Sequence, residues 1–146
     1  MTDSMVHQLT VVQRADGSWA WNLPRPPIQS GNIAATALAV QGLRFYPIPA
    51  RAREFIERIA HARRWLRLAK PQSVEERAFQ LLGLTWSGES RERLRPITAA
   101  LVAAQNPDGS WSQLPKLLGD AYGTGLALYA LLQGGEFPSN AATIRS

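Results

Sequence analysis

The chain of 146 residues has no cysteine and only two histidines. The lack of cysteine excludes a disulfide framework, thiolate metal ligands and a thiol nucleophile. His7 and His61 stand far apart in the sequence and do not form a His-Glu-x-x-His pattern. A lone histidine is more typical of a surface or packed position than of a metal site, so we predict no metal and no cofactor.

Long apolar runs are also missing. No stretch approaches the ~18 consecutive apolar residues that a membrane-spanning helix needs. Residues 1–10 lack both the basic segment and the apolar segment of a secretory signal peptide. We therefore expect a cytoplasmic protein, with peripheral attachment to a membrane as the alternative.

Positive charge is concentrated in one part of the chain. The net charge is +5, and residues 51–70 hold seven basic residues against Glu54 and Glu57. Such a run is usually a solvated helix face, and docking to anionic lipid or to an acidic protein is the alternative. Nucleic acid is not an expected partner, because aromatic residues do not alternate with the basic ones and no known binding module is present.

Six segments with helical periodicity are predicted, and they are of two kinds. Three are apolar almost all round and must be buried on most sides: 32–45, 74–86 and 120–133. The others have one apolar face or a weak pattern: 3–14, 50–68 and 90–105. Pro96 favours a later start for the last of these, near Arg95. The two kinds alternate, which predicts a single all-α domain over 1–146 with outer and inner helices.

A short motif occurs twice between these segments. Gln13-x-x-Asp16-Gly17-Ser18-Trp19 returns 92 positions later as Gln105-x-x-Asp108-Gly109-Ser110-Trp111. Asp and Gly favour a tight turn, because Asp bonds its own backbone and Gly permits positive φ. The Trp offers a large apolar surface and one N–H that needs an acceptor. We predict a structural turn with a buried Trp, and Gln105 as the partner of the Trp111 N–H.

The similarity between the two copies extends into the helix that follows each turn. Asn32, Thr36 and Leu38 correspond to Asp120, Thr124 and Leu126. A weaker third copy without the turn motif begins at Ser73 and continues through Ala78, Phe79 and Leu84. Trp21 has no counterpart in the second copy. Three copies of one unit predict a helical repeat array.

The repeated motif resembles the QW motif of the squalene and oxidosqualene cyclase family, and the helical pattern is similar to the wider prenyltransferase-like α/α toroids. The resemblance implies three α-hairpins, or about half of a ring of six. It implies little about activity, because the motif ties helices together. The family's Asp-x-Asp-Asp and Asp-Cys-Thr-Ala-Glu-like acid motifs are absent, and so is the Cys and His zinc set of protein prenyltransferases.

Asp120 is the one weak catalytic candidate, at the start of an inner helix. A carboxylic acid can donate a proton if burial raises its pKa. Helix capping explains the residue better, because Asn32 and Ser73 occupy the equivalent position and all three are good caps. Ser73 and Glu76 form a capping-box pattern, and Glu75 is interpreted as solvated.

The remaining candidates are inner-helix residues that could line a cavity for an apolar ligand, where aromatic rings attract cations. They are Phe79, Trp86, Tyr122, Thr124 and Tyr129. Aromatic residues at helical spacing are more often part of the core, and this alternative stays open.

Three hypotheses about function follow. The leading one is a non-catalytic repeat module that binds a partner protein or an apolar, isoprenoid-like ligand on its concave side. A fragment of a terpenoid cyclase whose acid lies elsewhere, and a basic membrane-binding module, are the alternatives. A half-ring has two open flanks, so we also expect a homodimer, or pairing with the missing half of a longer chain.

Overall fold

The computed structural model describes residues 3–20 and 31–134. Their regular elements are helical, as the periodicity predicted. In chain order they are α1 (Asp3–Val11), α2 (Gly31–Phe45), the 3₁₀ turn η1 (Pro49–Arg51), α3 (Ala52–Leu68), α4 (Val74–Trp86), α5 (Arg91–Ala103) and α6 (Ala121–Gly134). The predicted loop over 22–31 lies outside the described residues except for Gly31. Trp21 and the tail from Glu136 lie wholly outside them.

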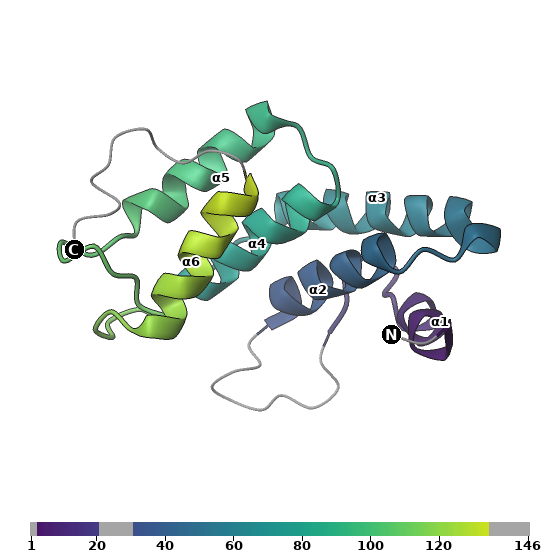
Figure 1. Ribbon diagram of the computed structural model, residues 1–146, viewed down its shortest axis with the longest axis horizontal. Coiled ribbons are helices and arrows are strands. Elements are labelled where there is room, and N and C mark those ends of the chain that lie inside the picture. Colours follow the sequence, from purple (N-terminus) through teal and green to yellow (C-terminus); the bar gives the residue numbers. More distant parts are fainter. Residues whose placement is uncertain (1–2, 21–30, 135–146) are drawn as a thin grey trace.

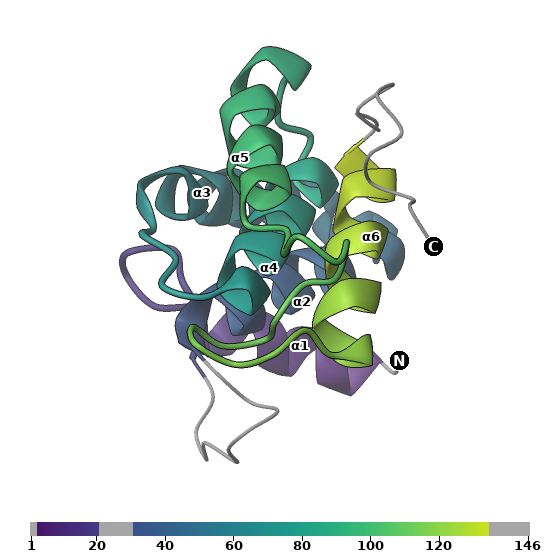
Figure 2. The same cartoon turned by 90° about the vertical axis from the view of Figure 1, so that its left-hand side faces the viewer.

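Helix α4 is the centre of the molecule. It packs against α2 on one side and α6 on the other, and it also contacts α3 and α5 (Figure 1). Seen along the long axis, α3 and α5 lie to one side of α4 and α6 lies to the other (Figure 2). This central position explains why α4 is buried on nearly every side.

The core consists mainly of aliphatic side chains from the inner helices, joined by a few residues of the outer helices and by the aromatic rings of Trp19, Phe55, Trp86 and Trp111. Leu81, Leu82 and Leu84 of α4 are fully buried, and Leu66 of α3 and Leu101 of α5 pack with them. Gly83 permits a close helix approach, because a Cβ at this position would lie 2.9 Å from the Cβ of Ala37 in α2. The predicted burial on most sides is therefore present in α2 and α4, whereas the same prediction was wrong for α6, which is exposed along one side because it has an inner-helix neighbour only at α4.

Several predicted helix ends were wrong. Helix α1 ends at Val11 instead of residue 14, because Gln13 and Arg14 belong to the first Trp turn. Helix α5 begins at Arg91, so Pro96 lies inside it and not at its start. Proline has no N–H, so the Glu92 carbonyl lacks its usual donor four residues on, and the helix continues because tertiary contacts with α4 and α6 hold it.

Candidate functional site

The two Trp turns have the same internal geometry. In the first, Asp16 Oδ1 accepts from the backbone N–H and the hydroxyl of Ser18, at 2.9 and 2.7 Å. In the second, Asp108 Oδ1 accepts from the same groups of Ser110, at 3.0 and 2.6 Å. Gly17 and Gly109 both have positive φ, 95° and 85°, which explains the glycine in each motif. The predicted tight turns are confirmed.

Each turn joins an outer helix to the inner helix that follows it. The indole N–H of Trp19 donates to the Leu9 carbonyl of α1, and its backbone N–H donates to the Thr36 hydroxyl of α2, at 2.8 and 3.0 Å. Trp111 uses its indole on Leu101 of α5 and its backbone on Thr124 of α6, at the same two distances. Both Trp rings are buried. In both copies the Trp therefore bonds the helix before the turn and the helix after it, and the role of the motif as a structural pin stays a prediction.

The glutamine of the motif has another role than the one predicted. Gln105 does not bind the Trp111 indole, because its amide donates to the Gly109 carbonyl at 2.8 Å and closes the turn. Gln13 makes the equivalent bond to Gly17 at 3.0 Å. The indole reaches the preceding helix because the chain reverses between the helix and the Trp, and the sequence does not encode this direction.

Asp120 caps α6. Its Oδ1 accepts from the Gly123 N–H at 2.7 Å, and Oδ2 accepts from the Gln113 N–H at 2.9 Å. The Gly123 and Gln113 backbone bonds hold the pKa of Asp120 below its usual range. A general acid needs a raised pKa to be protonated near neutral pH. The carboxylate is therefore fitted for capping, and this arrangement supports the structural interpretation over proton donation.

The other two predicted caps differ in detail. The Ser73 hydroxyl accepts from the Glu76 N–H at 3.1 Å, as in a capping box. The Glu76 carboxylate, however, accepts from the N–H of Gln72 instead of that of Ser73, at 2.6 Å. Helix α2 begins at Gly31, so Asn32 lies inside its first turn and not before it. The chain enters α2 with a positive φ at Gly31, which a repeat alignment does not reveal.

Glu75 is the residue that sequence reasoning missed. We expected it to be solvated, but it is 1% exposed. Its Oε1 accepts from the Tyr122 hydroxyl at 2.8 Å, and Gln113 Nε2 lies 3.4 Å from its Oε2. Burial and this bond to Glu75 raise the pKa of Tyr122 to about 12. The available signal was that Glu75 precedes Phe79 by four residues, which places the two on one side of α4.

The predicted cavity residues occupy different environments. Trp86 is buried in the core, and Phe79 is partly buried against it. Thr124 is committed to Trp111 through its hydroxyl. Tyr122 and Tyr129 are 43% and 42% exposed on α6. A role for these residues in lining a ligand cavity stays a prediction.

The two inner helices on either side of α4, which are α2 and α6, each have an exposed apolar face. On α6 it consists of Tyr122, Gly125, Tyr129 and Leu132, spaced three and four residues apart along one side. Helix α6 contains no charged residue. On α2, Leu38 and Phe45 are exposed and line a hollow of about 420 Å³. We call these the α6 face and the α2 face.

Part of the basic stretch over residues 51–70 is paired with carboxylates within the molecule. Arg51 and Arg58 both bind Glu54, and Arg53 binds Glu57. Arg67 forms a two-point ion pair with Glu89, in which Nη2 lies 3.0 Å from Oε1. These three carboxylates are outnumbered by the seven basic residues of 51–70, so the stretch keeps an excess of positive charge, and the solvated face and docking to an anionic surface both stay predictions. No described helix is long and apolar enough to cross a membrane.

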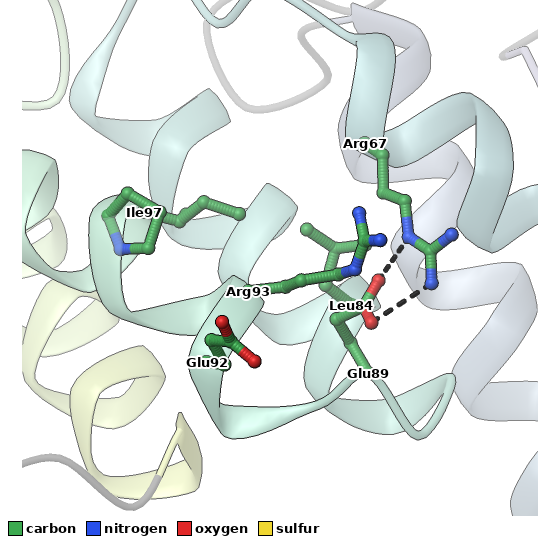
Figure 3. Close-up of a pocket in the computed structure, with 7 residues that line it drawn as sticks. Arg67, Leu84, Glu89, Glu92, Arg93 and Ile97 are labelled. Atoms are coloured by element: carbon green, nitrogen blue, oxygen red, sulfur yellow. Dashed lines mark hydrogen bonds and ion pairs between the residues drawn. The ribbon is translucent and has the colours of Figure 1, made fainter.

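Arg67 and Glu89 also line a hollow of about 470 Å³ between α3 and α5 (Figure 3). Glu92 and Arg93 complete its charged lining, and Leu84, Pro96 and Ile97 are the apolar part. Two positive and two negative side chains balance here. The hollow therefore has no net preference for an ion of either sign, and we call it the balanced hollow.

The two histidines do not come together. His7 is exposed and lies beside Arg51, with Nδ1 at 3.3 Å from the guanidinium, whereas His61 packs against Gly17. In the parts of the chain that the structure describes, no three His, Asp or Glu side chains form a group that could hold a metal ion. Comparison of the chain with family models, with curated proteins and with solved structures gave no match.

Proposed function

We propose that this chain is a non-catalytic helical-repeat module, similar to about half of a cyclase-type α/α toroid, and that it acts by binding a partner through apolar surfaces of its inner helices. Two observations support the repeat arrangement. Each Trp turn joins an outer helix to an inner one, and α4 packs between α2 and α6. We propose as well that the concave side of the module can bind an apolar ligand.

The observation that carries the proposal is the pair of exposed apolar faces on the two terminal inner helices. Tyr129 and Leu132 of α6 are 42% and 59% exposed, in a helix with no charged residue. Phe45 of α2 is 58% exposed. Contiguous apolar surfaces of this kind mark interaction sites. Helix α4 has an inner helix on each side, α2 and α6. Each of these two helices has an inner-helix neighbour on one side only, which is α4.

A second copy of the chain is the partner we propose. In a ring of two copies, the α6 face of each copy packs against the α2 face of the other, so the two-fold axis generates two equivalent contacts. This pairing gives α2 and α6 the second neighbour that α4 already has. A stable dimer of this kind should bury more than ~1,000 Å².

Sedimentation velocity at micromolar concentration tests this pairing. We expect the wild-type chain to sediment as a dimer, and Tyr129→Glu and Leu38→Glu each to shift it to the monomer, because a buried unpaired charge opposes association. The matched controls are Ile56→Glu and Leu68→Glu, which alter exposed apolar residues of α3 outside both faces. The controls should remain dimeric. A wild-type monomer that neither associates nor aggregates would contradict the proposed partner.

The absence of catalysis has its own test. We expect no cyclised product when the protein is incubated with squalene, because the hydrogen bonds on Asp120 favour its ionised form. Product analysis by gas chromatography is the measurement. Turnover by the wild-type chain that disappears in Asp120→Asn would overturn the non-catalytic proposal, whereas the dimer experiment does not depend on it.

A further inference from the structure

A hollow of about 360 Å³ lies at the end of the molecule where α4 begins. Its wall is formed by the first turns of α4, by the residues after α5, and by the connection from α5 to α6. That connection runs beneath the start of α4 in Figure 2. The hollow is separate from the α2 and α6 faces, none of whose residues line it.

The charged lining of this hollow has one sign. Arg77 of α4 and Lys116 of the connection are its charged residues, and both are positive. Glu76 is on the same turn of α4, but its carboxylate accepts from the Gln72 N–H and does not line the hollow. Glu75 is directed to Tyr122 and Gln113 instead. The balanced hollow, by contrast, pairs Arg67 with Glu89 (Figure 3).

Arg77 and Lys116 have no ion-pair or hydrogen-bond partner for their side chains among residues 3–20 and 31–134. Arg77 is nevertheless partly buried. A guanidinium withdrawn from water gains when an anion replaces the lost hydration. The other described arginines without a partner are exposed, so Arg77 differs from them in being partly buried.

The connection places Lys116 by a defined turn. The Leu117 N–H donates to the Leu114 carbonyl at 3.4 Å, and the Ser112 hydroxyl donates to the Leu117 carbonyl at 2.7 Å. Asn106 in turn donates to the Ser112 hydroxyl at 3.2 Å. The second cation is therefore carried on a segment that is bonded back to the body of the molecule.

We propose that this hollow, lined by Arg77, Lys116, Ser73 and Asn106, binds the phosphate of a small phosphate monoester whose substituent is apolar. A phosphate monoester carries about −1.5 to −2 charges at neutral pH, which matches the two cations. The Ser73 hydroxyl supplies a further donor, whereas the Asn106 amide nitrogen already donates to Ser110 and Ser112 and only borders the site. Val74 and Leu114 provide an apolar wall for the substituent. The volume is within the range of small-molecule sites, about 300–1,000 Å³.

Titration of isotope-labelled protein with phenyl phosphate, followed by NMR chemical shifts, tests this site. We expect saturable one-to-one binding, with the largest shifts in residues 72–77 and 112–117 and an affinity that falls as salt is added. Arg77→Gln and Lys116→Gln should each weaken binding about tenfold, because each removes a charge-assisted hydrogen bond. Arg93→Gln, in the balanced hollow, is the matched control and should bind as the wild type does.

Unchanged helical circular dichroism of the variants establishes that lost binding is not lost folding. Inorganic phosphate should bind more weakly than phenyl phosphate, because it leaves the apolar wall empty. The proposed site would be overturned if the Arg77→Gln/Lys116→Gln double variant bound phenyl phosphate as tightly as the wild type does. Chemical-shift changes confined to residues outside 72–77 and 112–117 would overturn it as well. Binding to vesicles that contain phosphatidic acid without binding of free phenyl phosphate would also overturn it, since the ligand would then be a membrane surface.

Discussion

The two Trp turns share a sequence and their internal hydrogen bonds, but they differ in what surrounds them. The first turn lies against α3. Gln13 Nε2 donates to the Arg58 carbonyl at 3.1 Å, and the Arg58 guanidinium donates back to Gln13 Oε1 at 3.1 Å. Gln105 has no such contact in the described structure, and its amide bonds only Gly109. The glutamine therefore attaches the first turn to α3, whereas the Gln105 amide bonds only within the second turn.

Gly17 of the first turn also lies close to α3. A Cβ on Gly17 would lie 2.7 Å from the His61 carbonyl oxygen of α3, so the backbones meet at this point. Gly17 thus serves both the local turn and the close packing of α3. The comparison shows that one local motif forms the same turn with or without contacts to α3, and that the first copy makes such contacts through Gln13 and Gly17.

The largest expected effect is the loss of either Trp ring. Trp19→Ala and Trp111→Ala should each lower the free energy of unfolding by about 3–5 kcal/mol, because both rings are buried and both indoles bind a helix carbonyl. Chemical denaturation monitored by circular dichroism is the measurement. A small loss at both positions would contradict the role of the turns as structural pins.

Gly17→Ala should have the second largest effect on the free energy of unfolding. Positive φ costs an L-residue about 1–2 kcal/mol, and the contact with His61 adds to that cost because two backbones must separate. Gly88→Ala is the matched control: its φ is also positive, at 80°, but the nearest atom to its Cβ is Arg63 Nη1 at 3.9 Å. A thermal melt should show the larger decrease for Gly17→Ala, and equal decreases would argue against the close contact.

The glutamines should separate the two turns directly. Gln105→Ala removes one hydrogen bond and should cost about 0.5–1.5 kcal/mol. Gln13→Ala removes an equivalent bond and two contacts with Arg58, so it should cost about 1–3 kcal/mol. Urea unfolding of the two variants under one set of conditions measures the difference. If Gln105→Ala costs as much as Gln13→Ala, the α3 contacts contribute nothing to stability.

The smallest expected effect is on the loss of stability at acidic pH. Bonds from Ser18 hold the pKa of Asp16 below its usual value, and bonds from Ser110 do the same for Asp108. A lowered folded-state pKa stabilises the protein above the unfolded pKa, and this stability disappears as the pH falls through the folded value. We expect Asp16→Asn and Asp108→Asn to flatten the loss of stability below about pH 4 by similar small amounts. Melts between neutral and acidic pH measure it, and a large difference between the two variants would argue against their similarity.

Part of the candidate site was predictable from local patterns. Ser73 and Asp120 were identified as caps because Ser and Asp before an apolar helix have few other roles. Glu75 was not identified, since its burial depends on Tyr122, 47 positions later in the chain. The same limit applies to the hollow of Arg77 and Lys116, whose residues meet only because α4 and the connection after α5 lie together.

The sequence by itself determined the helices and the two Trp turns, because these depend on residues within a few positions of one another; it did not determine the burial of α6, which is apolar but exposed along one side. Tertiary structure decided which carbonyl each indole binds, which glutamine reaches α3, and where Pro96 is tolerated inside α5. Such contacts join residues 10 to 47 positions apart, or depend on how much support a helix receives from its neighbours. Local propensity has no information about them, because packing against a distant segment can outweigh it.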